Sequence, residues 1–109
     1  AKAADELLQQ ATRLQDAGAQ LLVLECIPTE LAQQITATVN IPVIGIGAGI
    51  HCDGQVLVCY DMLGISKGKR PKFSKNFLTE NNSVAAAMSA YVQAVKEHTF
   101  PADEHSFDS

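Results

Sequence analysis

The sequence predicts an α/β fold built on a parallel sheet, and three features lead to this prediction. Two apolar runs, residues 21–24 and 41–46, do not alternate between polar and apolar side chains, which is typical of strands covered on both faces. A helical pattern of apolar residues precedes each run, in the order of stacked βαβ units. The 109 residues are 47% hydrophobic, so we expect one packed domain.

Residues 3–17 are expected to form the first helix, because apolar residues recur there at three- and four-residue steps. The buried stripe of this helix is predicted at Ala4, Leu7, Leu8, Ala11 and Leu14. Gly18 suits the left-handed conformation that commonly ends a helix. The strand at residues 21–24 follows and leads directly to the carboxylate of Glu25.

A second helix is expected after Pro28, with Thr29 as its cap and an end near Asn40. The inner face of this helix is predicted to contain Leu31, Ala32, Ile35 and Val39. The second strand, residues 41–46, has Pro42 near its start, where a missing backbone donor is tolerated, and it runs into a group of glycines.

Residues 55–64 are compatible with two structures. Their β-branched and compact side chains favour a third strand that ends at Asp61. Val56, Leu57 and Tyr60 would also fit one face of a helix. We favour the strand.

The rest of the chain is predicted to be a loop, a helix and a tail. Residues 64–76 are polar and basic, so we expect a loop over the carboxyl edge of the sheet. Helical spacing then joins Val84, Met88, Tyr91, Val92 and Val95. Ser83 or Asn82 can cap this helix, and Pro101 stands beyond its end. The polar tail, residues 102–109, is expected to be frayed or held by a neighbour.

Charge and cysteine content narrow the possible functions. A formal net charge of -4 gives no electrostatic reason to expect a nucleic acid or an anionic membrane as partner. No apolar run reaches the roughly 18 residues of a membrane span, so we expect a cytoplasmic protein. Cys26, Cys52 and Cys59 contain no CxxC pair, which is typical of small, reduced, buried thiols. A zinc site at His51 and Cys52 would need ligands outside any recognised zinc spacing.

Glu25 is the main candidate for chemistry, because ligands of parallel α/β sheets bind beyond the carboxyl ends of the strands. A structural carboxylate is an equal alternative at this position. Asp61 would share this location at the end of the third strand, but a structural hydrogen bond to a neighbouring loop is the favoured interpretation. Asp53 could cap, bind or solvate a turn. None of the three histidines has a serine or cysteine placed to suggest a catalytic triad.

Gly45, Gly47 and Gly49 do not fit the dinucleotide-binding spacing, since Ile50 or Cys52 stands where the last glycine is required. A structural role in a tight turn or a close approach is favoured for them, with ligand contact as the alternative. The basic residues of the following loop are Lys67, Lys69, Arg70, Lys72 and Lys75. We interpret them as a solvated or interface surface, with contact to a phosphate tail as the minor alternative.

A family resemblance covers essentially the whole chain and rests on five ordered blocks, residues 17–28, 41–49, 53–58, 71–77 and 104–107. Together these blocks closely resemble the C-terminal part of ketopantoate hydroxymethyltransferase (3-methyl-2-oxobutanoate hydroxymethyltransferase). The resemblance implies a (β/α)8 TIM barrel of the phosphoenolpyruvate/pyruvate group. Residues 1–109 would form a partial barrel domain with about the last three strands and their helices, and residues 55–64 would be the eighth strand. Since the chain opens at Ala1 inside a helical pattern, we expect it to be a piece of a longer polypeptide.

The resemblance also implies a reaction. The family transfers a hydroxymethyl group from 5,10-methylenetetrahydrofolate to 3-methyl-2-oxobutanoate, which gives 2-dehydropantoate for pantothenate and coenzyme A biosynthesis. Magnesium would hold the keto acid and stabilise its enolate. Glu25, in the Leu-Glu-Cys-Ile-Pro block, would be the general base.

The magnesium ligands and the residues that grip the keto acid are expected on strands outside this chain. The isolated chain is therefore expected to be inactive and to expose two open sheet edges. The resemblance further implies a homo-oligomer, without nucleic-acid or membrane partners. The alternatives are a non-catalytic α/β module that binds a small anion at Gly47 to Gly49, or one that serves only in oligomer assembly.

Overall fold

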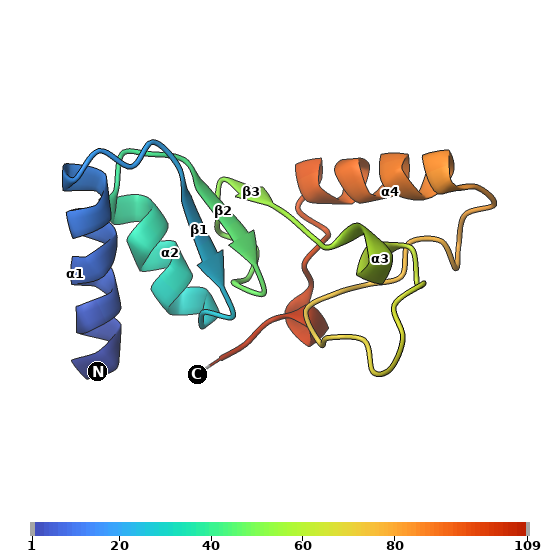
Figure 1. Ribbon diagram of the computed structural model, residues 1–109, viewed down its shortest axis with the longest axis horizontal. Coiled ribbons are helices and arrows are strands. Elements are labelled where there is room, and N and C mark those ends of the chain that lie inside the picture. The colour runs from blue at the N-terminus through green and yellow to red at the C-terminus, as the bar shows by residue number, and fades with distance from the viewer. Residues whose placement is uncertain (1, 109) are drawn as a thin grey trace.

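Three parallel strands form the sheet of the computed structural model, which describes residues 2–108 (Figure 1). The strands are β1 (Leu22–Glu25), β2 (Val43–Ile46) and β3 (Gly54–Gln55), in the spatial order β1-β2-β3. Leu22 lies opposite Val43 and Glu25 lies opposite Ile46. The predicted α/β class with a parallel sheet is confirmed.

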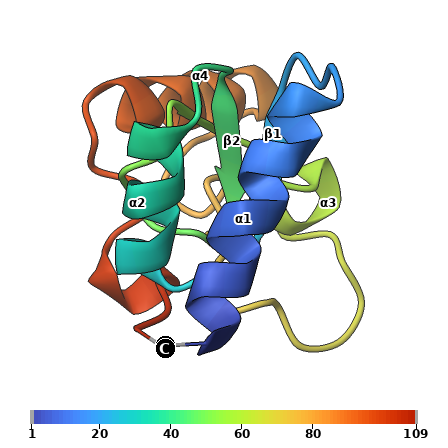
Figure 2. The ribbon, with the colours of Figure 1, turned by 90° about the vertical axis from the view of Figure 1, so that its left-hand side faces the viewer.

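Helices α1 (Lys2–Asp16) and α2 (Thr29–Thr38) lie together on one face of the sheet, as Figure 2 shows. Helix α1 ends before Gly18, whose φ of 107° is the left-handed stop that the sequence predicts. The predicted inner face of α2 is buried and consists of Leu31, Ala32, Ile35 and Val39. Ile35 and Val43 are the largest fully buried side chains, so the core of this part lies between α2 and β2.

The opposite face of the sheet is uncovered within residues 2–108, which corrects the expectation of strands buried on both faces. Leu22 and Leu24 are buried on the helix side, whereas Val23 is 54% exposed and Glu25 is exposed with it. We call the surface that contains Val23 and Glu25 the open face. In the predicted stripe of α1, Ala11 is buried, whereas Leu14, which lies beside the edge strand β1, is 49% exposed.

The third strand is shorter than predicted. It pairs with β2 only through Gly54 and Gln55, and the chain then leaves the sheet. Helix α3 (Cys59–Met62) follows, so the preference for a strand that ends at Asp61 is wrong.

Packing of Met62 explains this difference. Met62 is buried in a second apolar cluster with Phe77, and the Phe77 amide donates a hydrogen bond of 2.8 Å to the Met62 carbonyl. These contacts form only when the chain turns away from the sheet. The helical alternative is not confirmed either, because Val56 and Tyr60 are exposed and form no buried face.

Helix α4 (Val84–Lys96) begins at the predicted cap, since the Ala86 amide donates to Ser83 Oγ at 3.0 Å. Its buried face differs from the predicted one. Three residues of the predicted stripe, Val84, Met88 and Val92, are 49%, 42% and 48% exposed. The small side chain of Ala87, which is completely buried, lets the helix approach the aromatic ring of Phe77.

The loop at residues 64–76 has no helix or strand, as predicted. The tail is held by its own chain: a short 3-10 helix (Asp103–His105) is followed by Phe107, whose carbonyl accepts a hydrogen bond from the Thr29 amide. The expectation of a frayed tail is therefore wrong as far as Phe107, and residue 109 lies outside the described residues.

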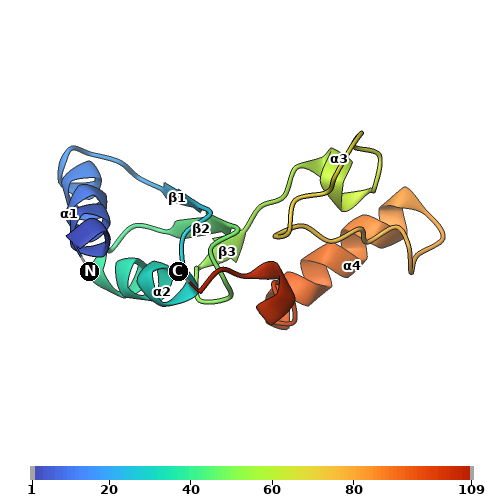
Figure 3. The same ribbon diagram turned by 90° about the horizontal axis from the view of Figure 1, so that it is seen from below.

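The molecule measures 44 × 25 × 23 Å, and its two apolar clusters follow one another along the longest axis (Figure 3). One cluster joins the sheet with α1 and α2, and the other joins α3, α4 and the segment around Phe100. No helix within residues 2–108 is both long enough and apolar enough to cross a membrane.

Candidate functional site

Glu25 lies at the carboxyl end of β1, opposite Ile46 of β2, and is exposed on the open face. The next residue, Cys26, has a φ of 52°, which is uncommon for a residue other than glycine. The Cys26 amide donates to the Ile46 carbonyl at 2.9 Å. The strand ladder thus holds the backbone of Glu25 while the chain turns sharply after it.

The surface beside Glu25 is apolar. Val23 lies two residues before Glu25 on the same face, and the register places Ile44 beside Val23 and Ile46 beside Glu25. This face therefore offers an exposed carboxylate at one end of a surface of branched aliphatic side chains. Such an arrangement can accept a proton from a small, largely apolar acid or ketone.

Thr29, four residues after Glu25, connects the start of α2 with the tail and with the loop after β2. Its amide and its hydroxyl both donate to the Phe107 carbonyl, at 2.9 and 3.2 Å. A Cβ atom added at Gly49 would lie 2.6 Å from Thr29 Oγ1. The prediction that Thr29 caps α2 is wrong, because the cap position is Pro28 and the Thr29 hydroxyl binds the tail instead.

Gly45 in β2 and the two glycines after it serve the structural role that the sequence favours. Gly47 and Gly49 have φ values of 71° and 82°, as a tight turn requires. A Cβ atom at Gly47 would lie 2.9 Å from the Phe73 ring, and one at Gly45 would lie 2.8 Å from Cys52 Sγ. Side chains of the chain itself therefore occupy the space beside these glycines, which gives no support to a small anion bound there.

The two aspartates of the sequence prediction do not join Glu25. Asp53 lies at the amino end of β2, where its Oδ2 accepts a hydrogen bond from the Val43 amide at 2.8 Å. Asp61 is buried in α3 and accepts a hydrogen bond from the Ser66 hydroxyl at 2.6 Å. The structural interpretation favoured for Asp61 is confirmed, and Asp53 closes the loop between β2 and β3.

Only one of the three cysteines is buried. Burial raises the pKa of the Cys52 thiol, a hydrogen bond with Thr36 lowers it, and the charge of Asp53 raises it. Cys26 and Cys59 are exposed, which corrects the expectation of buried thiols. Within residues 2–108, His, Cys, Asp and Glu side chains do not form a group of three that could hold a metal ion.

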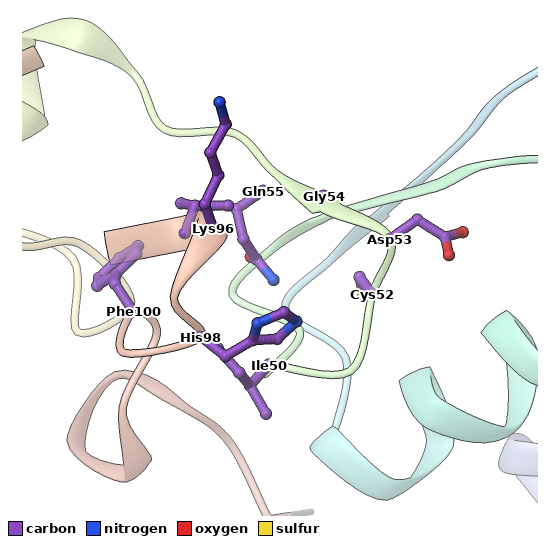
Figure 4. A pocket seen from close by; sticks show the side chains of 9 residues that line it. Ile50, Cys52, Asp53, Gly54, Gln55, Lys96, His98 and Phe100 are labelled. Atoms are coloured by element: carbon purple, nitrogen blue, oxygen red, sulfur yellow. The ribbon is translucent and has the colours of Figure 1, made fainter. Parts of the chain in front are cut away.

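A small cavity of about 140 Å³ lies between β3 and the end of α4, and no pattern in the sequence indicates it. Figure 4 shows the side chains of Gln55 and His98 pointing toward one another there, while the charged groups of Asp53 and Lys96 point away. The side-chain amide of Gln55 already donates a hydrogen bond from Nε2 to the Gly49 carbonyl at 2.9 Å. The cavity is therefore a packing space and adds no reactive group to Glu25.

Comparison with known proteins identifies relatives along nearly the whole chain. The family model described as ketopantoate hydroxymethyltransferase matches residues 1–103. The 3-methyl-2-oxobutanoate hydroxymethyltransferase of Methylococcus capsulatus is 60% identical over 107 residues, which are 98% of this chain and 39% of that protein. The protein of the same name from Marinobacter nauticus is 56% identical over 106 residues, 97% of this chain and 40% of the relative. The chain thus spans about 40% of the length of these relatives.

Proposed function

The chain belongs to the ketopantoate hydroxymethyltransferase family, and we propose that it contributes the general base to an enzyme with that activity. In this reaction 5,10-methylenetetrahydrofolate donates a one-carbon unit to 3-methyl-2-oxobutanoate. Water supplies the oxygen of the new hydroxymethyl group, and the products are 2-dehydropantoate and tetrahydrofolate. We propose a role in pantothenate biosynthesis on the basis of this family membership.

Glu25 supplies the base in this proposal. The hydrogen at C3 of 3-methyl-2-oxobutanoate is next to a ketone, so a carboxylate held close to it can remove it as a proton. The electron pair left at C3 then forms the bond to the one-carbon unit. The observation that carries the proposal is the exposure of Glu25 on the open face, at the carboxyl end of β1.

The apolar part of the open face fits the same substrate. C3 of the keto acid carries two methyl groups, and Val23, Ile44 and Ile46 form a surface of branched side chains beside Glu25. Methyl groups that pack on this surface would present the C3 hydrogen to the carboxylate. In a complete (β/α)8 barrel of the phosphoenolpyruvate/pyruvate group, which we propose for the full length, the open face would line the interior.

Magnesium does not fit the residues of this chain. Among residues 2–108 there is no group of three suitable side chains, and Asp53 and Asp61 lie away from Glu25. We propose that the magnesium ligands lie in the part of the relatives' length that this chain does not span. We also propose a cytoplasmic homo-oligomer and an inactive isolated chain.

The test is the substitution Glu25→Gln in an enzyme of the relatives' full length that carries this segment. Loss of a general base lowers turnover by about 10²- to 10⁴-fold, so we expect kcat to fall by at least 100-fold. Glu30→Gln is the matched control, since Glu30 is an exposed acid in the first turn of α2. A Glu25→Gln enzyme with near-normal kcat contradicts the proposal.

A further inference from the structure

The loop between α3 and α4 carries five basic residues within nine positions, and they do not enter the proposed chemistry. They are Lys67, Lys69, Arg70, Lys72 and Lys75. We call this set the basic loop. The chain as a whole has a formal net charge of -4, so this loop is a positively charged region of an acidic chain.

The basic loop is fixed at the same edge of the sheet as Glu25. Phe73, inside the loop, packs against Gly47, where a Cβ atom would lie 2.9 Å from its ring. Gly47 directly follows Ile46, the register partner of Glu25. Figure 1 shows the loop, in yellow, on the side of the molecule toward which the arrowheads of β1 and β2 point.

The tail holds the loop from the other side. The ammonium group of Lys72 lies 4.9 Å from the centre of the Phe107 ring, and Phe107 is bound to Thr29. Burial lowers the pKa of His105; the charge of Glu104 raises it, and those of Lys75 and Arg70 lower it. The last two effects place both cations close enough to the tail for their fields to reach it.

The cations remain accessible to solvent. Lys67, Lys69, Arg70 and Lys72 are exposed, and Lys75 is partly buried. The ammonium groups of Lys72 and Lys75 lie over aromatic rings, 4.9 and 5.0 Å from the ring centres of Phe107 and Phe77. The acids of the adjoining tail are Asp103, Glu104 and Asp108, so the loop carries more cations than the tail carries acids.

We propose that the basic loop binds the γ-linked oligoglutamate tail of the folate co-substrate. This inference rests on the proposed function, because it requires a folate whose one-carbon unit reaches a substrate beside Glu25. Each γ-linked glutamate adds one free carboxylate to a flexible chain that extends away from the pteridine. The four lysines and one arginine of the basic loop, at the carboxyl edge of the sheet, match this repeated negative charge. The arginine can bind a carboxylate through two hydrogen bonds.

The test compares tetrahydrofolate donors with one and with five glutamates in an enzyme of the relatives' full length that carries this segment. The loop variant Lys69→Gln/Arg70→Gln removes two exposed cations, and Lys2→Gln/Arg13→Gln removes two exposed cations from α1. One exposed ion pair changes affinity by a factor of about 1.5 to 5. We therefore expect the unmodified enzyme to have a KM about tenfold lower for the longer donor.

The loop variant should lose most of that difference at unchanged kcat, and the α1 variant should keep it. Added salt should also reduce the difference, because exposed charges are screened. Equal KM values for the two donors in the unmodified enzyme, or the same loss in both variants, would overturn the role of the loop. In that case, turnover with the one-glutamate donor would still support the proposed function. Absence of turnover with either donor would overturn the proposed function and this inference with it.

Discussion

Substitution of Gly49 by alanine tests whether the joint at Thr29 stabilises the fold. The added Cβ would lie 2.6, 2.7 and 3.0 Å from Oγ1, Cγ2 and Cβ of Thr29. Because these distances are too short and Cβ is fixed to the backbone, Thr29 must move as a whole. The two hydrogen bonds from Thr29 to Phe107 would then be lost or weakened.

A matched control isolates this effect. Gly68 has a φ of 84°, almost equal to the 82° of Gly49, but a Cβ added there would meet no atom within 4 Å. Both alanine variants therefore carry a similar cost of about 1 to 2 kcal/mol for a left-handed alanine. Only Gly49→Ala also loses the two bonds, which contribute about 0.5 to 1.5 kcal/mol each.

The difference between the two variants should thus be about 1 to 3 kcal/mol. For an enzyme of the relatives' length, thermal unfolding should show a midpoint lower by about 2 to 4 °C per kcal/mol in Gly49→Ala than in Gly68→Ala. Amide hydrogen exchange should show the local cause as faster exchange at Thr29. If Gly49→Ala is as stable as Gly68→Ala and the Thr29 amide stays protected, the joint does not stabilise this part of the molecule.

Tyr91, Cys52 and His105 are polar side chains that are buried or partly buried, and each can be tested. The Tyr91 hydroxyl is buried without a hydrogen-bond partner within residues 2–108. Tyr91→Phe should therefore raise the free energy of unfolding, measured by urea denaturation, by about 1 kcal/mol. A lower free energy of unfolding in the variant would show that the hydroxyl has a hydrogen-bond partner outside these residues. The raised pKa of Cys52 lowers the fraction of its thiol that is ionised. Iodoacetamide at pH 8 should therefore label buried Cys52 more slowly than exposed Cys26, as measured by mass spectrometry. Equal labelling rates would refute the burial of Cys52. Burial lowers the pKa of His105 below 6.5, and its neutral Nδ1 accepts a hydrogen bond from the Ala102 amide at 3.1 Å. The folded state therefore binds this proton more weakly than the unfolded state, so stability of the tail should fall as the pH drops below about 6.5; an NMR titration midpoint above 6.5 would contradict this sign.

Local signals explain which parts of the fold the sequence could predict. The stop at Gly18, the cap at Ser83 and the inner face of α2 each depend on residues within one or two helical turns. The same is true of Glu25 at the end of an apolar strand. These features are encoded where they occur, so a pattern along the chain is sufficient to find them.

Other features depend on contacts between distant residues. The Thr29 hydroxyl binds Phe107, 78 positions away, although its local sequence suits a helix cap. Helix α4 buries Ala87 and leaves Val92 exposed, because close approach to Phe77 favours a small side chain over a large apolar one. The position of the partner decides these cases, and the sequence pattern does not contain it.

Removal of the C3 proton by Glu25 can be measured as hydrogen exchange at C3. The full-length enzyme is incubated with 3-methyl-2-oxobutanoate in deuterium oxide without folate, and deuterium at C3 is followed by NMR. The unmodified enzyme and Glu30→Gln should incorporate deuterium at similar rates, while Glu25→Gln should do so at least 100-fold more slowly. Exchange at the unmodified rate in Glu25→Gln would show that another group is the base.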